Sequence, residues 1–317
     1  MIDPFGPGTL LGYCTNVHPD TSSAVRATGG AATRSGIEAV EAALLEHACA
    51  VKDRVSPDGP LPVGLWLSAR TAMQLVGEPA RFESFRDFLS THGLLPFTFN
   101  AFPWGDFHGP VVKHRVYRPD WSEYDRLEYT VAIAAIAADL CPTGDEVSIS
   151  TLPVAWGKSG GGRDRRGEPP CDLHAAARSL RSLAAHLSKM YQESGRLIHV
   201  DIEPEPGCFL DRAGDVVGFF KEFLLPGGPG GHEDAVRRHI RICHDVCHSA
   251  VMQEEQAGAL RTYAQAGLGV GKVQISAAIG VDLDRLAADR RAEAFAQLGA
   301  FAEDRYLHQT TVGDSHG

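Results

Sequence analysis

The chain has 317 residues, which is enough for one large domain or two ordinary ones. Hydrophobic residues make up 44% and charged residues 22% of it, so we expect a buried core and exclude global disorder. The formal net charge of −10 opposes contact with phosphate backbones, and we expect no nucleic-acid partner. The clearest basic cluster, 163–166, is short and contains an aspartate.

The first residues lack the basic start and the apolar stretch of a secretory signal peptide, and no run approaches the ~20 apolar residues of a membrane-spanning helix. The sequence therefore predicts a soluble, cytoplasmic protein without membrane insertion. Seven cysteines, an odd number in a chain of this size, favour reduced thiols over a disulfide framework. For Cys243 and Cys247 a buried structural role is favoured, with zinc ligation as the open alternative.

Short β-rich runs alternate with segments of helical periodicity along the chain. The predicted strands are 10–14, 63–67, 96–101, 147–152, 197–203, 240–245 and 272–276, and the predicted helices are 36–52, 81–92, 122–140, 172–193, 249–266 and 284–302. Ser122 with Asp125 resembles a capping box, and Gly195 and Gly267 stand where helices are expected to stop. The alternation predicts a parallel sheet, and this many units favour a closed (β/α)8 TIM barrel over an open sheet.

Only seven strands are clear in this pattern. After the last predicted helix only 305–311 has an extended character, so either this run closes the barrel or an eighth strand is missing. We favour a single TIM-barrel domain over 1–317 that is incomplete at its C-terminus. An open edge exposes unpaired backbone groups, so we expect either marginal stability or a homodimer through that edge.

Carboxylates and an imidazole stand at the ends of two consecutive predicted strands. The run 237–248 predicts a strand that leads into Asp245 and His248, and Glu203 and Glu205 end the strand before it. Strand ends of a barrel meet on one face, so these side chains are expected to share a site. Two nearby carboxylates raise each other's pKa unless a cation lies between them. Metal ligation by Glu203, Asp245 and His248 is favoured over a metal-free polar cluster.

Polar residues also stand at the other strand ends and in one long loop. The segment 157–170 is glycine-rich, and it is predicted to be either a solvated connector or a substrate lid. Glu205 is the expected general base, and Lys272 is expected to be a second catalytic group that binds a hydroxyl or phosphate. The residues expected to bind the rest of a small-molecule substrate are Asn16, His18, Asn100, Trp104, His108 and Lys158.

These strand ends resemble those of the xylose-isomerase-like TIM barrels, a superfamily of sugar isomerases, sugar epimerases and endonuclease IV. Glu203 matches its fifth-strand glutamate, and Asp245 and His248 match its Asp-x-x-His at the end of strand six. Gln274 stands where endonuclease IV has a histidine, and the strand-eight glutamate has no counterpart before Gly317. The resemblance implies a divalent metal, Mn²⁺, Mg²⁺ or Zn²⁺, with Gln274 as an additional ligand.

A more extensive resemblance, over nearly the whole chain, is to the metabolite-traffic proteins of the ebo gene clusters, the EboE family. It rests on segments that occur in the same order, namely 12–19, 103–109, 117–121, 148–153, 201–208, 245–248 and 272–276. Members of that family continue beyond a segment similar to 306–309 into strands that supply a glutamate. The resemblance implies a role in making or moving a specialised small metabolite, alongside a prenyltransferase and a dehydroquinate-synthase-like enzyme.

The leading hypothesis is a metal-dependent isomerase or epimerase that acts on a sugar-like or cyclitol metabolite. The metal would polarise a carbonyl or hydroxyl oxygen and stabilise an enediolate. A non-catalytic metabolite-binding or trafficking barrel is the alternative, favoured by Gln274 in place of histidine and by the absent strand-eight glutamate. Phosphodiester cleavage as in endonuclease IV is disfavoured by the charge of −10.

Overall fold

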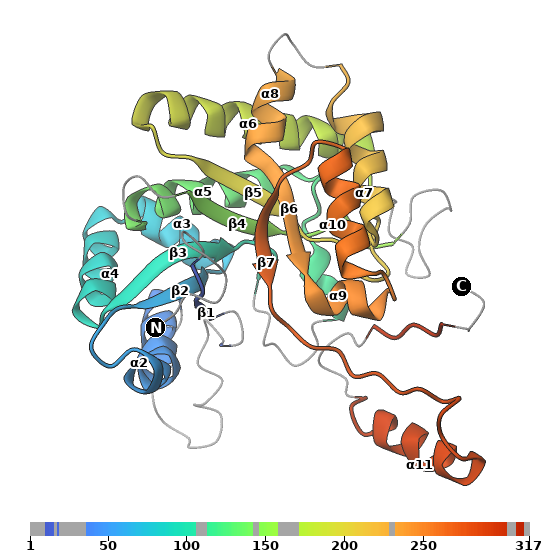
Figure 1. Ribbon diagram of the computed structural model, residues 1–317. Coiled ribbons are helices and arrows are strands. Elements are labelled where there is room, and N and C mark those ends of the chain that lie inside the picture. The colour runs from blue at the N-terminus through green and yellow to red at the C-terminus, as the bar shows by residue number, and fades with distance from the viewer. Residues whose placement is uncertain are drawn as a thin grey trace.

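The protein forms one sheet of seven parallel strands whose spatial order is their order in the chain (Figure 1). This computed structural model describes residues 10–15, 18, 36–105, 113–141, 146–157, 171–227, 232–302 and 309–313. The strands are β1 (Tyr13–Cys14), β2 (Leu61–Trp66), β3 (Leu94–Asn100), β4 (Val147–Thr151), β5 (Ile198–Ile202), β6 (Ile240–Asp245) and β7 (Val270–Gln274). Parallel strands in sequential order with helices between them are the arrangement of a TIM barrel, which confirms the predicted fold class.

Helices connect the strands and cover the outer face of the sheet (Figure 1). They are α1 (Ile37–Ala43), α2 (Cys49–Val55), α3 (Ala69–Gly77), α4 (Pro79–Thr91), α5 (Tyr124–Leu140), α6 (Leu173–Ser194), α7 (Ala213–Phe219), α8 (His232–His239), α9 (Val246–Val251) and α10 (Gln256–Gln265). A further helix, α11 (Ala288–Gly299), follows β7. The π-helical segments η2 (Leu44–Ala48) and η4 (Phe220–Leu224) continue α1 and α7, and the 3-10 helix η3 (Lys113–Tyr117) precedes α5. In the described part of the chain, none of the helices combines the length and hydrophobicity needed to cross a membrane.

The two faces of β5 show how the sequence builds the barrel. Ile198, Val200 and Ile202 are fully or almost fully buried in the hydrophobic core that the sheet shares with the helices. His199 and Asp201 alternate with them and are equally buried, because both faces of a parallel barrel strand are covered. The inner face of this strand is therefore polar, and it leads directly toward the predicted site.

A lysine on β7 shows that the sheet is curled, because it reaches toward β3 and β4. Lys272 Nζ donates to Ser150 Oγ on β4 over 3.1 Å and lies 3.3 Å from the carbonyl oxygen of Phe99 on β3. Since β5 and β6 separate β7 from β4 in the sheet, these contacts cross the barrel. At the two edges, β1 and β7 do not pair with each other within the described residues.

The part of the predicted run 305–311 that the structure describes forms no strand. Residues 309–313 are irregular, and 303–308 lie outside the described residues, so the described part of 305–311 does not close the barrel. Helix α11 projects away from the barrel, and none of its residues is buried (Figure 1). Marginal stability or dimerisation through this edge stays a prediction.

Several predicted boundaries were wrong for local reasons. The strand-like run that starts at 237 is only partly a strand, because 237–239 end α8, while the predicted strand 240–245 has the bounds of β6. The predicted capping box at Ser122 is absent, because the backbone N–H and hydroxyl of Ser122 both donate to Asp120 Oδ1 before α5 begins. The helix predicted over 249–266 is divided into α9 and α10 around Gln253, whose φ of 55° cannot continue a right-handed helix.

Helix ends that depend on glycine follow the prediction. Gly195 caps α6 with a φ of 72°, and Gly267 follows α10 with a φ of 68°. The helices α3, α7 and α8 were not predicted, and they are only 9, 7 and 8 residues long. For α3 a signal was present, because Ser68 accepts a hydrogen bond from the backbone N–H of Thr71 as a helix cap does.

Candidate active site

Two glutamates and a histidine converge where β5 and β6 end. The backbone N–H of Glu203 donates to Thr151 O and that of Glu205 donates to Leu210 O, which fixes the chain beyond β5. His248 lies in the first turn of α9, with Nδ1 3.5 Å from Glu203 Oε1 and Nε2 4.0 Å from Glu205 Oε1. Both glutamates are buried, so this cluster lies in a region of low dielectric constant.

Asp245 lies beside this cluster and caps helix α9. Its Oδ1 accepts hydrogen bonds from the backbone N–H of Cys247 (2.8 Å) and His248 (3.3 Å) and from the hydroxyl of Ser276, while Oδ2 accepts one from Gln274 Nε2 (3.0 Å). Burial alone would raise the pKa of Asp245, but His248 and these hydrogen bonds outweigh it, so its pKa lies below the ordinary value. Asp245 is therefore a fixed anion.

Glu203 and Glu205, in contrast to Asp245, have raised pKa values. Burial raises the pKa of Glu203 to about 7, against the opposing influence of His248, and burial also raises the pKa of Glu205. Burial alone would lower the pKa of His248, but the three carboxylates around it outweigh that effect, so its pKa is raised. In the described structure Glu203 Oε2 and Glu205 Oε2 are buried without a hydrogen-bond partner. Such oxygens are costly to bury, and a cation would satisfy them.

The ligand atoms at the start of α9 fit a divalent metal ion. One ligand atom each of Asp245, Cys247 and His248 lies within 4.8 Å of the others. His248 Nδ1 is 3.1 Å from the carbonyl oxygen of Pro204, a contact that orients the ring as metal-bound histidines are oriented and leaves Nε2 for a ligand. Carboxylate oxygens with an imidazole nitrogen suit Mg²⁺, Mn²⁺ or Zn²⁺.

Two side chains from distant segments hold Glu205. The Tyr117 hydroxyl donates to Glu205 Oε1 over 2.9 Å, and Gln309 Nε2 donates to the same oxygen over 2.7 Å. Gln309 also lies 3.1 Å from Pro206 O, so the chain near residue 309 covers the segment after β5. Burial and the nearby Glu205 raise the pKa of Tyr117 far above its usual range, so the phenol stays protonated. Neither residue was predicted as part of the site.

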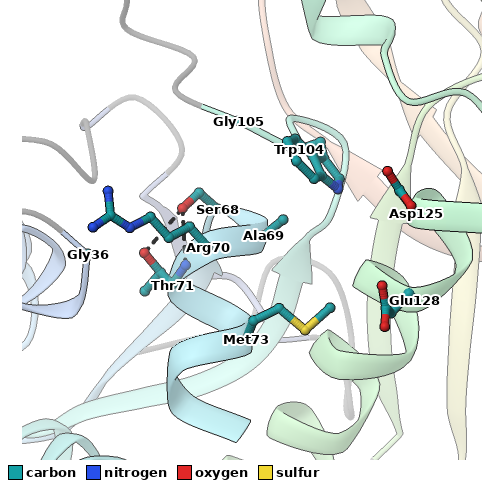
Figure 2. Close-up of a pocket in the computed structure, with 10 residues that line it drawn as sticks. All are labelled: Gly36, Ser68, Ala69, Arg70, Thr71, Met73, Trp104, Gly105, Asp125 and Glu128. Atoms are coloured by element: carbon teal, nitrogen blue, oxygen red, sulfur yellow. Dashed lines mark hydrogen bonds between the residues drawn. The ribbon is translucent and has the colours of Figure 1, made fainter. Parts of the chain in front are cut away.

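Two residues with packed rings, Tyr117 and Trp156, form an aromatic wall near Glu205. The rings of Tyr117 and Trp156 are 4.8 Å apart, and Gly207 has so little room against Trp156 that an added Cβ would lie 2.8 Å from the indole. Trp104, the tryptophan predicted to stack on substrate, lines a different pocket together with Ser68, Met73, Asp125 and Glu128 (Figure 2). The structure thus places Trp156, and not Trp104, beside the carboxylate cluster.

The other predicted site residues lie apart from the cluster or have other partners. Lys272 donates into the barrel interior, where its charge lowers the pKa of Glu203. Asn100 is buried and its Oδ1 accepts from the backbone N–H of Phe102. His18 contacts the Tyr13 hydroxyl at 2.8 Å and stacks on His47. Outside the described residues lie Asn16, His108, Lys158 and the rest of the loop 158–170.

The sequential parallel barrel defines the class of this protein, which has the fold of the xylose isomerase-like TIM barrels. A xylose isomerase-like TIM barrel protein from Mycobacterium smegmatis, solved in complex with magnesium, is similar over 97% of this chain and 92% of that chain, with 12% sequence identity and a TM-score of 0.50. A 3-keto-D-glucoside 4-epimerase from E. coli covers 80% of this chain and 84% of its own, with 17% identity and a TM-score of 0.40. At 12% identity the first of these likenesses establishes the fold alone. No protein-family model and no curated protein matches the chain.

Proposed function

We propose that the protein is a divalent-metal-dependent isomerase or epimerase that acts on a sugar-like or cyclitol metabolite. One observation carries the proposal. Glu203 and Glu205 meet His248 at the end of the barrel, and each glutamate keeps a buried oxygen without a partner in the described structure. A structural cluster would satisfy those oxygens internally, whereas a binding site leaves them for a cation and a substrate.

Glu203, Asp245 and His248 would hold the metal ion, and Gln274 would join them through its amide oxygen. Gln274 Nε2 donates to Asp245 Oδ2. Rotating the amide by half a turn would present its oxygen in place of its nitrogen, and that oxygen would serve a cation as a further ligand. When bound, the metal would supply Lewis-acid polarisation of a substrate carbonyl or hydroxyl oxygen.

Glu205 would be the general base. Tyr117 and Gln309 hold Oε1, so Oε2 is the atom that would accept a proton from the substrate carbon next to a carbonyl group. The C–H electron pair would then form the C=C bond of an enediolate. Return of the proton to the former carbonyl carbon gives an isomer, with the hydroxyl proton passing from the new carbonyl oxygen to the former one. Return to the opposite face of the same carbon gives an epimer. The raised pKa of Glu205 suits a group that both takes and returns a proton.

Lys272 and the aromatic wall would complete the site. The Lys272 ammonium lies in the barrel and would act as a second catalytic group through its positive charge near Glu203. Trp156 would offer a ring face to a sugar or cyclitol ring beside Glu205. We also propose that the chain is a member of the EboE family, on the ordered segments that resemble it, and that its substrate belongs to a specialised-metabolite pathway.

The second candidate is a barrel that binds or carries a metabolite without turnover. The hydrogen bonds of Gln309 to Glu205 and of Gln274 to Asp245 favour it, because they stabilise the carboxylates without a metal. The two functions make different predictions for solvent exchange. A catalytic Glu205 takes a proton from carbon and exchanges it with water, whereas a carrier leaves every C–H bond intact.

The test is deuterium incorporation measured by NMR. The protein, loaded with Mn²⁺, is mixed in D₂O with a panel of ketoses, aldoses and keto-cyclitols. Exchange at a carbon next to a carbonyl supports the proposal, and Glu205→Gln should abolish that exchange while it retains metal. Binding of a panel member without any exchange in the unmodified protein would support the carrier function. Neither exchange nor binding across the panel would contradict the proposed substrate class.

A further inference from the structure

We propose that Cys247 is a thiolate ligand of the metal ion held by Asp245 and His248, so that the site prefers zinc over magnesium. This inference rests on the metal site of the proposed function, and it adds a ligand outside the carboxylate and imidazole set. In the sequence Cys247 reads as a small buried residue between two candidate ligands. The structure gives it a different position.

The geometry brings three different donor atoms to one side of the first turn of α9. The sulfur of Cys247, a carboxylate oxygen of Asp245 and a ring nitrogen of His248 all lie within 4.8 Å of one another. Two atoms bonded to one metal ion at about 2.0–2.3 Å lie no more than about 4.6 Å apart, so these three atoms are near the spacing of a common ligand set. No other three such residues in the described part of the chain bring their ligand atoms this close together.

The backbone of this turn is already fixed for binding. The N–H groups of Cys247 and His248 both donate to Asp245 Oδ1, and Cys247 N also lies 3.2 Å from Ser276 Oγ. The Asp245 side chain therefore positions the residues that carry the other two donors. Little conformational freedom remains to be lost when a metal binds, which favours affinity.

A second observation points to a cation at this turn. Glu203 is only 4% exposed, its Oε1 lies 3.5 Å from His248 Nδ1, and its Oε2 has no hydrogen-bond partner among the described residues. A buried carboxylate beside a histidine ring, with one oxygen left without a partner, is an arrangement that a cation would satisfy. Cys247 is thus one of several potential metal ligands at this turn and not an isolated thiol.

Cys243, which lies in β6, has a different environment from Cys247. Cys243 is completely buried and does not belong to the ligand cluster, whereas Cys247 is half-buried and belongs to it. Burial raises the pKa of the free Cys247 thiol to about 11, so without metal it is protonated at neutral pH. When the metal–sulfur bond forms, the thiol proton leaves to solvent.

The consequence is metal selectivity. Thiolate is a soft ligand that favours Zn²⁺ over Mg²⁺, and magnesium is held by hard oxygen ligands. A site built from Glu203, Asp245 and His248 alone would accept either ion. Cys247 would shift that balance toward zinc.

Cobalt substitution tests the inference with a spectroscopic signal that does not depend on activity. Co²⁺ is added to the metal-free, full-length protein, and absorption is recorded in the visible and near-ultraviolet ranges. Visible d–d bands report cobalt in the site, and a strong near-ultraviolet band reports a thiolate–cobalt bond. We expect both in the unmodified protein. Cys247→Ser should lose the near-ultraviolet band, and its affinity for Zn²⁺ should fall at least about tenfold while its affinity for Mg²⁺ changes little.

Cys49→Ser is the matched control, because Cys49 is also half-buried but lies in α2, outside the ligand cluster. It should keep both absorption features. Cys247→Ala serves as a second variant, and thermal melting shows that each variant is folded. Visible bands without the near-ultraviolet band in the unmodified protein would overturn the inference and leave the proposed function standing. No cobalt binding at all would overturn both.

Discussion

The Tyr117 hydroxyl donates a hydrogen bond to Glu205 Oε1 over 2.9 Å, although 88 positions separate the two residues in the chain. Tyr117 ends the 3-10 helix η3, and Glu205 lies in the segment after β5. Both groups are buried, so the bond forms in a region where it is stronger than in water. It leaves the second oxygen of Glu205 as the one available for chemistry.

Replacement of Tyr117 by phenylalanine should weaken the proposed base in a measurable way. The hydrogen bond from Tyr117 lowers the pKa of Glu205, so its loss should raise that pKa further above the ordinary value. In the proposed reaction the acidic limb of the pH–rate profile should move to higher pH. The free energy of unfolding should fall by about 1–3 kcal/mol, because a buried acceptor loses a donor.

Tyr124→Phe is the control for that variant, since the Tyr124 side chain is 71% exposed at the start of α5. It should leave both the profile and the stability unchanged. An unmoved acidic limb in Tyr117→Phe would show that Tyr117 supports the fold without tuning Glu205.

The stability of the metal-free protein should depend on pH through Glu203. In the folded protein the pKa of Glu203 is raised from 4.5 to about 7, so folding favours its protonated form. The resulting contribution to the free energy of unfolding is complete below pH 4.5 and is lost as pH rises through about 7. The loss is on the order of 3 kcal/mol. The raised pKa of His248 acts in the same direction, because its contribution is complete below pH 6.5 and is lost above its folded pKa.

Denaturant unfolding between pH 4 and 8 measures this effect. Glu203→Gln should remove much of the slope and should be more stable than the unmodified protein at pH 8. Addition of Mn²⁺ or Zn²⁺ should reverse the trend in the unmodified protein, since metal binding requires deprotonated ligands. A stability that is flat over this range without metal would contradict a raised pKa for Glu203.

Sequence reasoning reached the fold because the alternation of apolar runs is a local property of the chain. The predicted strand 240–245 has the bounds of β6, and the predicted strand 197–203 exceeds β5 by one residue at each end. Boundaries failed where a side chain found an unforeseen partner, as Ser122 did with Asp120. Such contacts depend on the path of the loop and not on periodicity.

For the site, the sequence predicted which residues stand at strand ends but not which distant segments return to them. Glu203, Glu205, Asp245 and His248 follow two neighbouring strands, and barrel geometry brings such ends together. Gln309 and Tyr117 reach Glu205 from segments that no periodicity connects to it. Trp104 and Trp156 are equally plausible stacking residues in sequence, and only the path of the chain separates them.

Metal occupancy should depend on the residues of the cluster. Elemental analysis of protein purified without chelator should find roughly one equivalent of a transition metal per chain. Asp245→Ala or His248→Ala should reduce that occupancy sharply, because each removes one of three or four ligands. His92→Ala, on the outer helix connection after α4, should retain the metal. The proposal would be contradicted if the purified protein held no metal and if millimolar Mn²⁺, Zn²⁺ or Mg²⁺ did not raise its melting temperature.

Nucleic acid should not bind at physiological salt. The formal net charge of −10 repels the phosphate backbone, and the sequence offers no long basic stripe. Fluorescence anisotropy with duplex DNA, intact or with an abasic site, measures this. Micromolar affinity for the abasic duplex would revive the endonuclease alternative.

Gly271 should be intolerant of any side chain, because the interior of the barrel closes against it. A Cβ built on Gly271 in β7 would lie 2.3 Å from Asp201 Oδ1 and 2.6 Å from His199 Nδ1. These two side chains are buried and hydrogen-bonded to each other over 2.6 Å, so they cannot move aside without breaking that bond. Gly271→Ala should therefore cost about 1–3 kcal/mol of unfolding free energy.

Gly214→Ala is the matched control, since nothing lies within 4 Å of a Cβ at this position in α7, and it should be neutral or stabilising by about 0.5–1 kcal/mol. Thermal and denaturant unfolding of the two variants decides the question. Equal stability of both would mean that β7 does not lie against β5 in solution as it does in the structure.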